Sequence, residues 1–230
     1  MEKKLWIDVE GAGRVSGSLS LPDGKRESMP WATGIILAHG AGGHMDNPDL
    51  VQFARDLSEA GHPVLRFNFF YTESGRKAPD RPPLLGAAWE AAHRAFAARE
   101  DCRLDSIVAA GKSMGGRIAS ELVAAGRLSV KALVFLGYPL HPAGRPERLR
   151  DAHLYHIRVP LLFFAGTRDP LCNLDLLRGV LGRLEAPFTL DVVEGGDHSF
   201  HLPRSAGTPS AEVYRRLAER TGSWLAGLGG

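Results

Sequence analysis

The 230-residue sequence contains only two cysteines, Cys102 and Cys172, which are too few for a disulfide framework. No apolar run approaches the roughly 20 residues that a membrane-spanning helix needs. The lysines near the N-terminus are not followed by the apolar segment of a signal peptide. These absences predict a cytoplasmic protein with reduced thiols and no membrane partner.

An excess of charge of either sign is also missing. The chain has 28 Lys and Arg against 26 Asp and Glu, a net charge of +2. The basic cluster Arg145–Arg150 is interpreted as a solvated loop, so we expect no nucleic-acid partner. The histidine pairs of HLYH (153–156) and HSFH (198–201) have no further ligands nearby in the sequence, so we expect no metal site.

What the sequence does contain is a regular alternation of apolar runs and helically spaced segments. A continuous apolar run typical of a strand buried on both faces occupies residues 33–40, and further strands are predicted at residues 62–69, 106–111, 131–139, 160–169 and 188–196. Helices are predicted at residues 48–61, 84–100, 115–126, 173–184 and 210–228. This order favours the α/β class, with a mostly parallel central sheet and helices on both faces.

The remaining segments complete a single predicted domain over residues 1–230, because no repeat or linker divides the chain. Residues 4–9 and 15–22 predict an antiparallel pair of strands at one edge of the sheet, followed by a turn at residues 22–24. Residues 71–83 are predicted to be a polar loop.

One stretch, AAGKSMGGR at residues 109–117, places a serine between glycines where a predicted strand passes into a predicted helix. Residues 111–115 fit G-x-S-x-G, the nucleophile-elbow motif, in the context that the motif demands. Small residues at positions 111 and 115 relieve crowding and leave the Ser113 hydroxyl exposed at a helix N-terminus. A phosphate-binding P-loop is rejected because position 106, which must be Gly in that motif, is Ser.

A serine nucleophile needs a base, and the base needs an orienting group. Asp169 lies at the end of one predicted strand, and His198 follows the last one. Both loops should open at the same sheet edge as Ser113, because the carboxyl ends of parallel strands meet there. We therefore predict a triad of Ser113, Asp169 and His198, with Asp197 ranked lower because sequence neighbours usually point apart.

Backbone and pocket groups are predicted around this triad. The glycine-rich segment LAHGAGGH (37–44) can expose backbone amides, and we expect the N–H groups of Ala41 and Met114 to form an oxyanion hole. Side chains near strand ends are expected to line the substrate pocket: Phe70, Tyr71, Tyr138, Leu140 and Phe200.

Three neighbours of the triad are interpreted as structural. Lys112 could bind an acidic group of the substrate or tune His198, but we expect its stem to pack locally and its charge to lie in water. Arg117 is expected to pair with a carboxylate. Cys172 is expected to be a buried filler rather than a second nucleophile.

Several motifs together resemble those of the α/β-hydrolases, more narrowly of small members without a lid. They are HGAGG (39–43), RFNFFY (66–71), GKSMGGR (111–117), GYPLHPAGRPERLR (137–150) and GTRDPLC (166–172). From about Gly34 onward the chain resembles bacterial hydrolases related to testis-expressed protein 30 and to the hydrolase-like subunit of a histone-acetyltransferase complex. Dienelactone hydrolases are more distant relatives and carry Cys at the nucleophile position. One departure is Phe70, where the family pattern leads us to expect Pro.

The resemblance implies the α/β-hydrolase fold without a large cap domain and the same triad. We predict a serine hydrolase that cleaves small-molecule carboxylic esters through an acyl-enzyme, with no cofactor. Residues 140–157 are too few for a helical lid, so the site should be open or shallow, with residues 71–83 at its rim. The same triad also serves thioesterases and acyltransferases, and a non-catalytic interaction module is a further alternative. The oligomeric state is left open.

Overall fold

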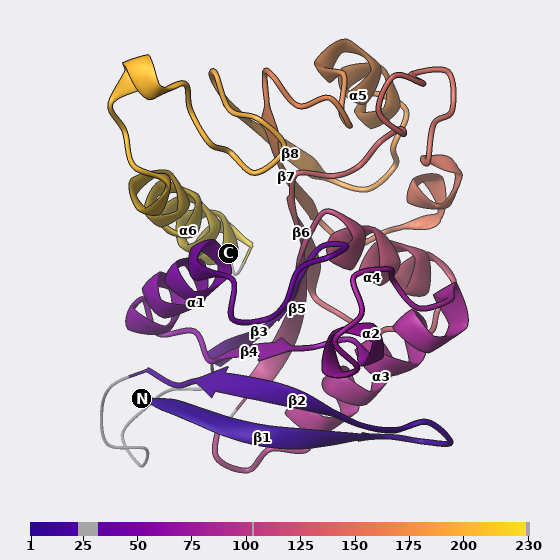
Figure 1. Ribbon diagram of the computed structural model, residues 1–230, viewed down its shortest axis with the longest axis vertical. Helices are drawn as coiled ribbons and strands as arrows, with labels where there is room; N and C mark the ends of the chain where they lie inside the picture. Colours follow the sequence, from indigo (N-terminus) through magenta and orange to yellow (C-terminus); the bar gives the residue numbers. More distant parts are fainter. Residues whose placement is uncertain (23–31, 103, 229–230) are drawn as a thin grey trace.

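The computed structural model describes residues 1–22, 32–102 and 104–228. At its centre is an eight-stranded sheet in the order β1-β2-β4-β3-β5-β6-β7-β8 (Figure 1). The strands are β1 (Glu2–Val9), β2 (Gly13–Ser20), β3 (Ala32–Ala38), β4 (Val64–Phe67), β5 (Leu104–Lys112), β6 (Ala132–Leu136), β7 (Leu161–Gly166) and β8 (Phe188–Val193). The helices are α1 (Pro48–Glu59), α2 (Phe70–Glu73), α3 (Pro82–Ala97), α4 (Met114–Ala124), α5 (Leu174–Leu181) and α6 (Ser210–Gly227).

The strand directions confirm the predicted mostly parallel sheet. β1 pairs antiparallel with β2, and β2 pairs antiparallel with β4. From β4 through β3 to β8 every pair is parallel. The antiparallel pair therefore lies at one edge, as expected, while the turn predicted at residues 22–24 falls largely outside the described residues.

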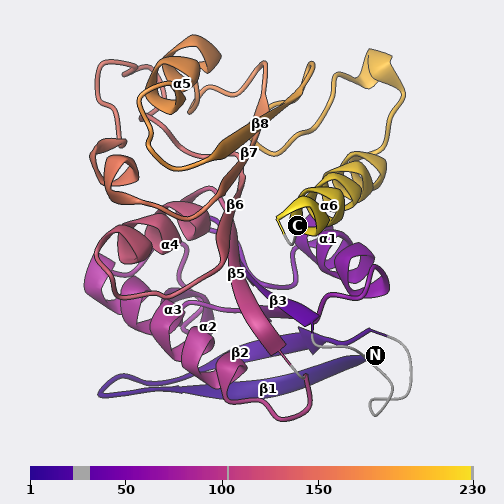
Figure 2. The same cartoon turned by 180° about the vertical axis from the view of Figure 1, so that it is seen from behind.

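Helices cover both faces of the sheet (Figures 1 and 2). α1 and α6 pack together on one face, and α3 and α4 cover the other. The pleat of each strand supplies both cores: Ile36 and Ala38 belong to one apolar cluster, whereas Ile35 and Leu37 belong to the other. Burial on both faces explains why the sequence of this strand is continuously apolar.

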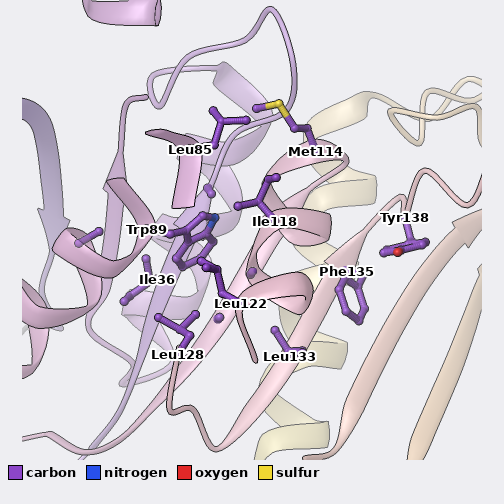
Figure 3. Packing of buried hydrophobic residues seen from close by; sticks show 14 of the residues in the cluster. Ile36, Leu85, Trp89, Met114, Ile118, Leu122, Leu128, Leu133, Phe135 and Tyr138 are labelled. Carbon is purple, nitrogen blue, oxygen red and sulfur yellow. The ribbon is translucent and has the colours of Figure 1, made fainter. Parts of the chain in front are cut away.

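The packing of α3 against α4 fixes the start of α4. Figure 3 shows the Trp89 ring of α3 beside Ile118 and Leu122 of α4. Trp89 is fully buried, and its Nε1–H donates to the carbonyl oxygen of Gly115 at 3.0 Å. This bond ties a side chain of α3 to the main chain in the first turn of α4, two residues after the predicted nucleophile.

Residues 71–83 differ from the expected loop. The segment begins within the short helix α2, and α3 already starts at Pro82. The local cause is the Asp80 carboxylate, which accepts the N–H of Tyr71 at 2.9 Å and so ties the two ends of the segment together. Residues 140–157 hold one 3-10 turn, Ala152–His156, and no longer helix. Within the described residues no helix has the length and apolar character needed to cross a membrane.

Candidate active site

The turn between β5 and α4 carries Ser113 in a left-handed conformation, with φ of 51°. The chain can turn this tightly only because its neighbours lack side chains. A Cβ on Gly111 would lie 2.2 Å from the nitrogen of Gly116, and a Cβ on Gly115 would lie 2.6 Å from the carbonyl oxygen of His39. Neither glycine of the motif can therefore be replaced without moving backbone atoms. This close packing holds Ser113 in its strained conformation.

The structure brings Ser113, His198 and Asp169 together in one hydrogen-bonded chain. His198 Nε2 lies 2.8 Å from Ser113 Oγ, and His198 Nδ1 lies 2.7 Å from Asp169 Oδ2. The Asp169 side chain is fully buried, and its second oxygen accepts the N–H of Leu171 at 2.8 Å. This arrangement fits a neutral imidazole that donates from Nδ1 and accepts the serine proton at Nε2.

Asp197, the lower-ranked acid, caps the loop after β8 instead. Its Oδ1 accepts the N–H of Ser199 at 2.7 Å and of His201 at 3.0 Å. The loop Asp197–His201, which we call the base loop, is thereby closed on itself around His198.

The loop after β3 approaches the nucleophile from the other side. A Cβ on Gly40 would lie 3.3 Å from Ser113 Cβ, and Gly43 N–H donates to the Gly40 carbonyl at 3.1 Å, which makes a tight turn. Ala41 lies in this turn, at the hollow beside Ser113. Met114 opens α4, so no earlier turn of the helix accepts its N–H. Both amides that we assign to the oxyanion hole thus flank Ser113.

His39, at the end of β3, is a site residue to which the sequence analysis assigned no role. Its ring is buried, with Nδ1 2.9 Å from the Gly40 carbonyl oxygen and Nε2 accepting the Phe69 N–H at 3.3 Å. Burial lowers the pKa of His39 to about 4, so the ring is neutral and supports the loop over Ser113. The sequence feature that could have identified His39 as a site residue is its position directly before the glycines of HGAGG.

An open hollow of about 300 Å³ lies beside Ser113. It is enclosed by the loop after β3, the start of α1, the base loop and Tyr214 of α6. Its wall is mixed, with the polar side chains of Asn47, Asp49 and Lys112 alongside Leu50 and Leu171. Polar groups at this wall can orient a small substrate next to the nucleophile.

The predicted pocket residues lie elsewhere, and none belongs to the described lining of this hollow. Tyr71, Tyr138, Leu140 and Phe200 are at most 1% exposed, and Phe70 is half-buried near Gly13. The aromatic hydroxyls instead brace main-chain segments: that of Tyr71 donates to Gly40 and that of Tyr138 to Arg150. Burial of apolar area draws these rings into the core behind the site rather than onto its wall.

Three residues near the triad were interpreted as structural from the sequence: Arg117, Lys112 and Cys172. Arg117 pairs with Glu121 one turn along α4, as expected. Lys112 differs from expectation, because its Nζ donates to the main-chain carbonyl of His198 instead of lying in water. Burial raises the pKa of Cys172 to about 12, which keeps this thiol protonated and unreactive. The described residues include no group of three or more His, Cys, Asp or Glu arranged to hold a metal ion.

The chain is similar to a known family and to several solved structures. A family model described as alpha/beta hydrolase domain matches residues 32–226. A dienelactone hydrolase from Anabaena variabilis superimposes with a TM-score of 0.76 at 22% identity, over 98% of this chain and 97% of its own. The esterase domain of a Rhodothermus marinus protein superimposes with a TM-score of 0.71 at 18% identity, over 97% of this chain and 97% of its own.

A Xanthomonas campestris protein described as a serine hydrolase without a lid gives a TM-score of 0.68 at 22% identity, over 96% of this chain and 94% of its own. At these identities the likeness concerns the fold: an eight-stranded, mostly parallel sheet with helices on both faces and no large cap domain.

Proposed function

Because this chain belongs to the alpha/beta hydrolase domain family, we propose that it is a serine hydrolase that cleaves small carboxylic esters through an acyl-enzyme. The observation that carries the proposal is the unbroken hydrogen-bonded chain from Ser113 Oγ through His198 to the buried carboxylate of Asp169. Its serine end opens onto a hollow that can admit a substrate.

Acylation follows from this geometry. Ser113 Oγ bonds to the ester carbonyl carbon while its proton passes to His198 Nε2, 2.8 Å away. The carbonyl oxygen becomes an oxyanion, which the N–H groups of Ala41 and Met114 stabilise. When the bond to the alcohol breaks, His198 returns the proton to the departing oxygen, and the acyl group remains on Ser113.

Deacylation repeats these steps with water. Water gives a proton to His198 and attacks the acyl carbon, and His198 passes that proton to Ser113 Oγ as the bond between Oγ and the acyl carbon breaks, which releases the carboxylic acid. Asp169 stabilises the imidazolium in both halves through its 2.7 Å contact with Nδ1. The buried position of this carboxylate strengthens the interaction, because water does not screen it.

The limited size of the hollow supports small substrates. A space of about 300 Å³ is at the lower end of the range for small-molecule sites. We therefore expect kcat/KM to be higher for acetyl and butyryl esters than for esters of ten or more acyl carbons. Matched esters and thioesters of one short acyl group would separate an esterase from a thioesterase that uses the same triad.

Labelling by a fluorophosphonate, read by intact mass and by mapping of the modified residue, tests the proposal. One adduct on Ser113 is expected, and Ser113→Ala should lose both the adduct and ester hydrolysis while its circular dichroism spectrum is unchanged. Ser120→Ala is the matched control, since Ser120 is buried in α4 and donates to the Arg117 carbonyl. Absence of an adduct on the folded wild-type chain would contradict the proposal and favour a non-catalytic interaction module.

A further inference from the structure

We propose that Lys112 is a positioning residue: its ammonium group holds the main-chain carbonyl of His198 and so keeps the imidazole where it can accept the Ser113 proton. This inference rests on the proposed hydrolase function, since it assigns a role within that reaction. It gives a purpose to a partly buried cation that lies outside the hydrogen-bonded chain of the Ser113, His198 and Asp169 side chains.

The contacts of Lys112 join the three loops that form the site. Its Nζ donates to the His198 carbonyl and lies 5.8 Å from the centre of the Phe200 ring. Its stem passes Gly40, where a Cβ would lie 3.6 Å from Lys112 Cγ. A Cβ on Gly137, after β6, would lie 3.2 Å from Nζ and 2.8 Å from the His198 carbonyl oxygen. The Lys112 side chain therefore reaches from the loop after β3, which carries Ala41, to the base loop.

The base loop needs such an anchor because part of it is strained. Phe200 adopts φ of 62°, and within the described residues Ser113 is the only other non-glycine with positive φ. Its ring is fully buried and packs edge-on against Tyr214 at 6.0 Å. A bulky residue in this conformation persists only where its surroundings hold it. Lys112 supplies a hydrogen bond to this loop from a different strand, two residues before Phe200.

The ammonium group also lies close to the imidazole that it positions. Nζ and His198 Cε1 both lie within 3.5 Å of the position of a Gly137 Cβ, so they are no more than about 7 Å apart. Burial lowers the pKa of Lys112 to about 8, so at and below neutral pH the side chain keeps the charge that strengthens its hydrogen bond to the carbonyl.

Other ionisable groups face this position from each neighbouring element. They are Asp49 of α1, Tyr214 of α6, His39 and His44 of the loop after β3, Asp169 of the loop after β7, and Asp197 and His201 of the base loop. Among the described residues no carboxylate lies within 4.0 Å of Nζ, the distance of an ion pair. Holding a cation at this partly buried position without a paired anion costs solvation free energy, which favours a functional reason for its presence.

The test compares Lys112→Met, which removes the donor and the charge, with Lys112→Arg, which keeps both. Lys131→Met is the control, since Lys131 precedes β6 at the opposite end of the strand from the site. The readouts are kcat and KM for a short-chain p-nitrophenyl ester from pH 5 to 9, the rate of fluorophosphonate labelling, and the melting temperature.

We expect Lys112→Met to lower kcat at least tenfold with KM changed less than twofold, because the imidazole loses the hydrogen bond that positions its main chain. Lys112→Arg, which keeps a charged donor, should recover most of the lost kcat, and Lys131→Met should match the wild type. If Lys112→Met does not fold, Lys112→Gln, which keeps an N–H donor without the charge, should show a smaller fall in kcat, again with KM changed less than twofold.

Two results would overturn the inference while leaving the proposed function standing. One is an active wild type whose kcat is unchanged in Lys112→Met. The other is a raised KM at unchanged kcat, which would assign Lys112 to substrate binding. A wild-type protein that neither hydrolyses esters nor takes the label would instead refute the proposed function itself.

Discussion

Replacing Gly166 by alanine should disturb catalysis without touching any residue of the proposed triad. Gly166 ends β7, three residues before Asp169, and lies against the chain that leads into the base loop. A Cβ there would lie 2.2 Å from the carbonyl oxygen of Gly196 and 2.7 Å from that of Asp197. These neighbours are main-chain atoms, which cannot rotate away as a flexible side chain would.

The size of the displacement follows from these distances. Ordinary contact begins at 3.4 Å, so the Gly196 carbonyl must move by about 1.2 Å. Two residues later the chain reaches His198, whose Nε2 is set at 2.8 Å from Ser113 Oγ. A shift of about 1 Å at a reacting group can lower a rate about 100-fold. Crowding of this kind costs about 1–3 kcal/mol of stability, or about 2–12 °C in melting temperature.

The assay pairs the rate of fluorophosphonate labelling with a thermal melt of Gly166→Ala. Gly179→Ala is the matched control, because a Cβ on Gly179 meets nothing within 4 Å and the residue lies in α5. Alanine in that helix should leave labelling unchanged and raise stability slightly. A Gly166→Ala protein with wild-type labelling and melting temperature would refute the reasoning that this contact sets the position of His198.

Two further predictions concern the supports of the site. The pKa of His39 falls from 6.5 in the unfolded chain to about 4 in the folded protein, so the unfolded state binds the proton first. Wild-type stability should therefore drop by about 3 kcal/mol between pH 7 and pH 4 through this group, and urea unfolding of His39→Gln should show a smaller drop. Trp89→Phe should lose about 1–3 kcal/mol in the same assay at pH 7, because the change removes the hydrogen bond to the Gly115 carbonyl and leaves unfilled volume at a fully buried position. A Trp89→Phe midpoint equal to that of the wild type would contradict this role.

Much of the fold could be predicted because its signals are local. The six runs predicted as strands correspond to β3 through β8, and those that are buried along their whole length, such as β6 and β7, are apolar throughout. The elbow was recognisable for the same reason. A tight turn needs small residues at fixed spacing, and Gly111 and Gly115 stand where backbone atoms leave no room for a Cβ.

The order of the candidate triad along the chain was also predictable, because parallel strands bring their carboxyl ends to one edge of the sheet. Ser113, Asp169 and His198 each follow a different strand and meet there. That these three residues perform the chemistry stays a prediction until the labelling experiment is done.

The directions of individual side chains were predicted less well than the strands and turns. Phe200 and Tyr138 follow strands as pocket residues often do, yet both are buried. Lys112 was expected to lie in water, yet its ammonium group meets the His198 carbonyl. In each case the alternatives differ by a rotation about one or two bonds, and no local pattern distinguishes them.

By itself the sequence determined most of the strands and helices, where the backbone turns sharply, and which candidate residues of the triad lie at one edge of the sheet. These properties depend on spacing and on steric limits within a few residues. Only the tertiary structure decided which side chains fill the core, which line the hollow, and that His39 and Lys112 brace the two loops beside Ser113. Those outcomes depend on competition for space and for hydrogen-bond partners among residues up to 86 positions apart, as Lys112 and His198 are.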